Sequence, residues 1–158
     1  MPISQMEMLV RFTLALVLGA VMGLERELAG KEAGIRTCML VSAGAGIFTI
    51  IALNLPSIVA LSTGNLSDLL AHNAGFLSII ANIVLGVGFL GGGIIVKSEN
   101  HVHGLTTAAV VWATAAIGIL AGLGMIKFAI ISTILIVCLL YLLRRMDIAS
   151  VVKRINED

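Results

Sequence analysis

The sequence predicts an all-α membrane protein with about five transmembrane helices, and its composition, apolar runs and charge placement support that fold class. Of its 158 residues, 59% are hydrophobic and 12% are charged, and the mean hydropathy is +1.10. A soluble domain has about 45–50% apolar and about 25% charged residues, so this chain has too few charges to cover a water-facing surface. The formal net charge is +1 and there is no basic stripe, so we expect no nucleic-acid partner.

Five apolar runs approach the length of about 20 residues that a membrane-spanning helix needs. The runs are continuous and do not alternate with a period of two, which argues against barrel strands. The predicted spans are residues 8–24, 37–55, 74–96, 105–123 and 125–143. They form one predicted transmembrane domain over residues 1–146, followed by a short cytoplasmic tail over residues 147–158.

The charges between the spans predict the orientation of the chain. Lys and Arg gather in the first loop, in the third loop and in the tail, whereas residues 56–73 contain neither. By the positive-inside rule, the N-terminus lies outside and the C-terminus in the cytoplasm. Residues 56–73 are then expected to form an extracytoplasmic connector with one short interfacial turn over residues 67–73, and a lid is the alternative.

The first and third spans show a weak likeness that suggests a parallel hairpin repeat. Each has two glycines four residues apart near its cytoplasmic end. Similar helix starts follow at residues 34–37 and 104–107. A parallel repeat about an axis along the membrane normal would explain both features. Chance similarity between Gly- and Ala-rich helices would also explain them.

Three pairs of glycines and one tryptophan are candidate packing residues. Small residues let helix backbones approach closely in lipid, where no hydrophobic force drives helices together. The candidates are Gly19, Gly23, Gly88, Gly92, Gly118, Gly122 and Trp112. The glycines could instead provide flexibility or bare backbone for an ion. Packing within one chain and packing between copies remain equally open.

Polar residues inside or beside the spans are few, and two groups could carry function. Carboxylate and amide oxygens suit a hard ion such as Mg²⁺, so Glu25, Glu27 and Asn82 are candidate metal ligands. A functional cytoplasmic rim is the second candidate, formed by Arg26, Arg36, Thr37, His103, Thr106 and Thr107. Thr37 and Thr107 suit helix N-caps. The alternatives are that charged residues only anchor the helix ends and that Asn82 bridges helices.

The sequence contains no motif of an enzyme active site. A Walker loop, HExxH and G-x-S-x-G are all missing from it. We therefore expect a protein that is not an enzyme and has no certain cofactor, with Mg²⁺ as the one candidate ion.

Three stretches in order along the chain resemble the MgtC/SapB family of bacterial inner-membrane proteins. They are LGAVMGLERE at residues 18–27, GVGFLGGG at 86–93 and GLTTAA at 104–109, the last followed by Trp112. The resemblance implies a multi-pass protein of about five spans that serves growth in low magnesium or survival under host stress. It also implies action on other membrane proteins, ATP synthase among them, although the family is often described as magnesium transporters.

The chain departs from the family pattern at three places. Many members carry a soluble C-terminal domain of the ACT type, which is not expected here because the chain ends soon after its fifth predicted span. Asn82 stands where many members have Gln, and His103 stands where Arg usually precedes Gly-Leu-Thr-Thr. His103 keeps a hydrogen-bond donor but makes the charge depend on pH.

Two functions follow as expectations. In the first, the protein regulates other membrane proteins through helix–helix contacts and forms a homo-oligomer, such as a dimer. In the second, it is a transporter or channel for Mg²⁺ or another cation, with an ion site at the cytoplasmic rim. None of the nine Asp and Glu residues lies at the middle of a predicted span, which favours the first.

Overall fold

The computed structural model describes residues 3–63, 66–97 and 102–145, with the side chains of residues 55–74 left out of the description. The elements are α1 (Gln5–Leu28), α2 (Ile35–Thr63), α3 (Leu66–Ile94), β1 (Val96–Lys97), β2 (Val102–His103), α4 (Leu105–Gly122) and α5 (Ile126–Arg145). Each α-helix contains a segment long and apolar enough to cross a membrane. The predicted all-α fold with five spanning helices is therefore confirmed, while the orientation of its termini stays a prediction.

The connector expected over residues 56–73 is mostly helical, which corrects that part of the prediction. The helix α2 continues through Pro56 to Thr63, and α3 already begins at Leu66. Proline in a helix interior removes one backbone hydrogen bond, but residues 58–61 are Ile-Val-Ala-Leu and extend the apolar helical pattern past it. The antiparallel hairpin of β1 and β2, in which Val96 pairs with His103, was not predicted.

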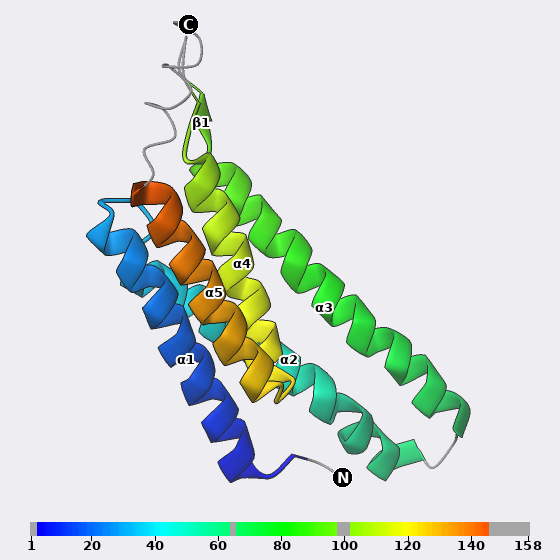
Figure 1. Ribbon diagram of the computed structural model, residues 1–158. Helices are drawn as coiled ribbons and strands as arrows, with labels where there is room; N and C mark the ends of the chain where they lie inside the picture. The colour runs from blue at the N-terminus through cyan, green and yellow to red at the C-terminus, as the bar shows by residue number, and fades with distance from the viewer. Residues whose placement is uncertain (1–2, 64–65, 98–101, 146–158) are drawn as a thin grey trace, which may run out of the picture.

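The helix α2 lies at the centre of the bundle and packs against α1 and α4 (Figure 1). Of the apolar segments, about half of α2 and of α4 is buried, against 11% in α3 and in α5. Figure 1 shows α3 beside α4 near the β-hairpin and away from α1 and α5. The three inner helices therefore form the core, and α3 and α5 present most of their surface outward.

Close backbone contacts around Ser42 of α2 hold the three inner helices together. A Cβ atom at Gly19 of α1 would lie 2.6 Å from the backbone oxygen of Cys38 and 2.8 Å from the Cβ of Ser42. A Cβ atom at Gly118 of α4 would collide with the backbone oxygen of Ser42. Glycine is required at both positions because any side chain would separate the helices.

The same kind of contact recurs along α2 at both ends of the bundle. Gly23 of α1 would place a Cβ atom 2.5 Å from the Cα of Ile35, and Gly122 of α4 would place one 2.7 Å from the Cβ of Thr49. The predicted packing pairs on α1 and α4 thus both face α2.

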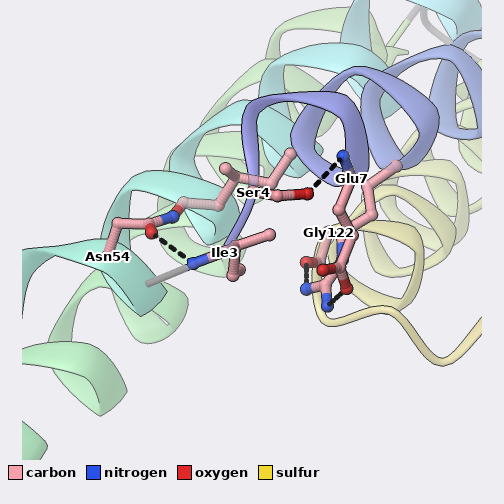
Figure 2. Close-up of polar contacts among 7 residues, drawn as sticks. Ile3, Ser4, Glu7, Asn54 and Gly122 are labelled. Atoms are coloured by element: carbon pink, nitrogen blue, oxygen red, sulfur yellow. Dashed lines mark hydrogen bonds and ion pairs between the residues drawn. The ribbon is translucent and has the colours of Figure 1, made fainter. Parts of the chain in front are cut away.

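Polar contacts fasten the end of the bundle that contains the N-terminus (Figure 2). Ser4 caps α1, because its hydroxyl oxygen accepts a hydrogen bond from the backbone N–H of Glu7 at 3.2 Å. Arg11 of α1 donates to the backbone oxygen of Gly122 at 2.8 Å and pairs with Glu7 at 2.5 Å. Arg11 therefore joins the first helix to the C-terminus of the fourth.

We predict that Gly118→Ala lowers the free energy of unfolding by about 1–3 kcal/mol, because the new methyl group overpacks the contact with Ser42. The matched control is Gly88→Ala on α3, where a Cβ atom meets nothing within 4 Å. The control should keep or raise stability by up to about 1 kcal/mol, since alanine favours helix over glycine. Unfolding of both variants in mild detergent by added SDS measures the difference, and equal stabilities would contradict the packing described here.

Candidate functional site: the rim at the start of α2 and α4

The predicted functional rim forms where α1 and α5 end and α2 and α4 begin (Figure 1). The turn after α1 depends on Gly30, whose positive φ of 66° lets the backbone reverse. The hairpin of β1 and β2 ends in Gly104, whose φ of 83° and contact with the backbone of Ile94 both exclude a side chain. These two glycines direct α2 and α4 back into the bundle, side by side.

A buried ion pair lies at the inner edge of this rim. Arg26 Nε donates to Glu25 Oε2 at 2.6 Å, and the side chains are only 4% and 7% exposed. Arg26 also lies near the buried thiol of Cys38, which contacts Thr114 of α4. Of Glu25 and Glu27, Glu25 is the buried acid, and the adjacent Arg26 balances its charge.

Three buried polar atoms in this region have no hydrogen-bond partner among the described residues. They are Glu25 Oε1, Arg26 Nη1 and Ser42 Oγ. An unpaired polar atom in a buried position costs free energy. The Glu25–Arg26 ion pair therefore leaves one polar atom of each side chain without a hydrogen bond to the described residues.

The carboxylate of Glu27 caps α2. Its Oε2 accepts a hydrogen bond from the backbone N–H of Ile35 at 3.0 Å. A carboxylate is well placed at a helix N-terminus, where free N–H groups and the helix dipole attract negative charge. Glu27 therefore has a structural role in this arrangement.

A second acid lies beside the start of α4. Thr107 Oγ1 donates to Glu32 Oε2 at 3.3 Å, so the loop after α1 touches the fourth helix. The N-cap of α4 is Gly104, which has no side chain to cap it. The interpretation of Thr37 and Thr107 as N-caps is wrong, because α2 and α4 begin two residues earlier, at Ile35 and Leu105.

The other rim candidates lie at the surface. Arg36, Thr37 and Thr106 are exposed in the first turns of α2 and α4, and His103 is exposed in β2. The structure thus brings the predicted rim residues to one end of the bundle. It buries Arg26 and Thr107 and leaves the remaining four accessible.

The three candidate metal ligands have separate surroundings. Glu25 is paired with Arg26, Glu27 caps α2, and Asn82 lines a groove between α2 and α3. In the part of the chain that the structure describes, no three His, Cys, Asp or Glu side chains lie together as a metal site would require. A Mg²⁺ site therefore stays a prediction without geometric support here.

The glycine pair predicted on α3 behaves differently from those on α1 and α4. A Cβ atom at Gly88 or Gly92 would meet nothing within 4 Å, whereas the neighbouring Gly91 packs against Ala108 of α4. Trp112 of α4 is also outward-facing, with 50% of its surface exposed. Among the described residues, Gly88 and Gly92 thus have no close neighbour where a side chain would point, and half of the Trp112 surface is uncovered.

Sequence reasoning missed Ser42 and Glu32. Ser42 belongs to a series of small or polar residues at helical spacing (Cys38, Ser42, Gly46 and Thr49), and that spacing could have identified the central face of α2. Glu32 lies in a short loop and gives no comparable signal.

The five apolar helices and the polar rim define the chain as a multi-pass membrane protein. The model of the MgtC family matches residues 12–148, and the chain belongs to that family. No solved structure matches the chain.

Several bacterial proteins are similar to this chain at 38% identity. Protein MgtC of Salmonella typhimurium aligns over 143 residues, 90% of this chain and 53% of its own length. Protein MgtC of Brucella abortus aligns over 130 residues, 82% of this chain and 48% of its own. An uncharacterized protein of Haemophilus influenzae aligns over 127 residues, 80% of this chain and 51% of its own. The chain spans about half the length of the curated relatives it matches.

We predict that replacing one member of the buried Glu25–Arg26 pair lowers the free energy of unfolding more than replacing both members. Glu25→Leu or Arg26→Leu alone leaves one uncompensated buried charge and should lower the free energy of unfolding by about 3–5 kcal/mol. The double variant Glu25→Leu/Arg26→Leu leaves no charge and should recover most of that loss. SDS-induced unfolding of all four proteins completes the cycle, and additive losses in the double variant would contradict a coupled pair.

Proposed function

We propose that this chain regulates other proteins of the bacterial inner membrane by packing α3 against their transmembrane helices. The observation that carries the proposal is the open surface of α3 around Gly88 and Gly92, where a Cβ atom would meet nothing within 4 Å. Close approach through small residues drives helix association in lipid. The backbone of a partner helix could therefore pack against Gly88 and Gly92, just as the backbone of α2 packs against the glycines of α1 and α4.

Family membership supports both the setting and the class of partner. The resemblance described above associates MgtC/SapB proteins with growth in low magnesium, with host stress and with control of complexes such as ATP synthase. A bacterial ATP synthase offers bundled transmembrane helices of the kind that α3 could pack against. It is therefore the partner chosen for the test.

The surroundings of the acids support regulation over transport. Glu25 is charge-balanced by Arg26, and Glu27 is hydrogen-bonded to the start of α2. Glu25 Oε1 has no hydrogen-bond partner, but Arg26 already balances the charge of this carboxylate, and no three His, Cys, Asp or Glu side chains gather around it among the described residues. The alternative function, a channel or transporter for Mg²⁺, would have to use residues other than these two as arranged here.

We predict that Gly92→Leu abolishes regulation of a co-reconstituted ATP synthase. Wild-type protein should lower ATP-driven proton pumping in proteoliposomes, measured by quenching of a pH-sensitive dye. Leucine at position 92 should restore pumping because its side chain fills the space that a partner backbone needs. The matched control is Ala116→Leu, which adds similar bulk to an exposed position of α4.

Two other outcomes would redirect the assignment. Loss of regulation in Ala116→Leu but not in Gly92→Leu would move the docking face from α3 to α4. Mg²⁺ flux into liposomes above the empty-liposome background, lost in a folded Glu25→Gln variant, would favour transport.

A further inference from the structure

A second outward face of α3 carries a polar residue, Asn82, near the middle of the apolar segment Gly75–Ile94. Gly75, Ser78, Asn82, Gly86 and Gly93 follow helical spacing along this face, and all five are exposed. We call them the Asn82 stripe. At about 100° per residue, the stripe points well away from Val87 and Gly91, which face the rest of the bundle.

Two residues of the Asn82 stripe, Asn82 and Gly86, line an apolar groove of about 510 Å³ between α2 and α3. Asn82, Gly86 and Leu90 line it from α3, and Leu40, Gly44 and Phe48 line it from α2. A Cβ atom would meet nothing within 4 Å at Gly44 or Gly86, so a neighbouring backbone could come close on either wall.

Asn82 determines which kind of occupant fits this surface. Its side chain makes no hydrogen bond to the described residues, and it lies near the middle of the apolar segment Gly75–Ile94. An amide has two donors and an acceptor, and hydrocarbon satisfies none of them. A lipid acyl chain could fill the groove but would leave the amide unpaired, whereas a helix with a polar side chain at that depth would satisfy it.

We propose that the occupant is a second copy of this chain, packed along the Asn82 stripe about a two-fold axis. All copies enter the membrane in the same orientation, so such an axis lies along the membrane normal and each residue meets its counterpart at the same depth. The two Asn82 amides then face each other, each donating to and accepting from the other. The interface is isologous, because the same surface serves both copies.

Phe89 supplies apolar contact to this dimer. It lies between Gly86 and Gly93 on the same face and is 85% exposed. The two glycines leave space on either side of it, so a phenylalanine of the second copy can pack there. Shape and hydrogen bonding are thus both self-complementary along the stripe.

The dimer and the proposed regulatory contact use different faces of α3. Gly86 and Gly88 are two residues apart and therefore point about 200° apart around the helix. A dimer through Gly86 leaves Gly88 and Gly92 open to another protein. Self-association can accordingly be tested, and can fail, independently of the proposed function.

We predict that the full chain self-associates in liposomes and that the Asn82 stripe controls it. Energy transfer between copies labelled at their N-termini, measured as the protein is diluted in lipid, gives the dissociation constant. Asn82→Leu should raise that constant roughly threefold to tenfold through loss of the interhelical hydrogen bonds. Asn82→Gln keeps the amide and should recover much of the affinity. Gly86→Leu should abolish dimerisation, and Gly88→Leu is its matched control.

Cross-linking locates the interface independently. In a Cys138→Ser background, Ser78→Cys should give a covalent dimer with copper phenanthroline as the oxidant. Leu77→Cys, about 100° away on the same helix, should not. A circular dichroism spectrum like that of the wild type shows that each variant remains folded.

Three results would overturn the proposal. Energy transfer absent from the wild type at high protein density excludes self-association. A dimer lost in Gly88→Leu but kept in Gly86→Leu places the interface on the other face. A monomeric wild type that retains a phospholipid by native mass spectrometry, lost in Gly86→Leu, identifies an acyl chain as the occupant.

Discussion

The contact of two glycines with one turn of α2 is the constraint on which the rest of the structure depends. Gly19 of α1 and Gly118 of α4 approach the backbone around Ser42 from two sides. Lipid supplies no hydrophobic force between helices, so this closeness provides the dispersion contact that holds the bundle. Because α1, α2 and α4 are tied there, α3 and α5 are left at the periphery. The outward surface available for other proteins follows from that division.

Some charged residues of the rim stabilise the fold through contacts within it, and others are exposed. Glu25 and Arg26 neutralise each other in a buried position, and Glu27 and Glu32 engage the beginnings of α2 and α4. Glu27 thus does for α2 what the hydroxyl of Ser4 does for α1, since each side chain accepts a hydrogen bond from a backbone N–H at the start of the helix. Arg36 and His103 remain accessible beside them.

Composition and apolar run length predicted the five helices, because lipid allows few alternatives to a helix with internally satisfied backbone groups. The extent of α2 beyond Pro56 was not predictable in that way, since proline and polar residues usually mark a turn. Glycine spacing identified the contacts of Gly19, Gly23, Gly118 and Gly122 but could not show whether they lie within one chain. Gly88 and Gly92 have the same spacing, but a Cβ atom at either position would meet nothing within 4 Å. Whether a glycine pair makes a contact therefore depends on how the whole helices pack, which the spacing alone does not reveal. The roles of Glu27 and Glu32 depend on loop geometry, which the order of residues does not encode in any simple pattern.

The bond from Arg11 to Gly122 has a consequence for the order of assembly. Arg11 lies in α1, which leaves the ribosome before α4, and the carbonyl group that it binds lies more than a hundred residues later. Until α4 is inserted, Arg11 lacks that carbonyl group and keeps its ion pair with Glu7, one turn away. During synthesis there is therefore a stage in which α1 is present but Arg11 has not yet formed its hydrogen bond to Gly122. The end of α4 completes it, so the membrane bundle closes only when its fourth helix is in place.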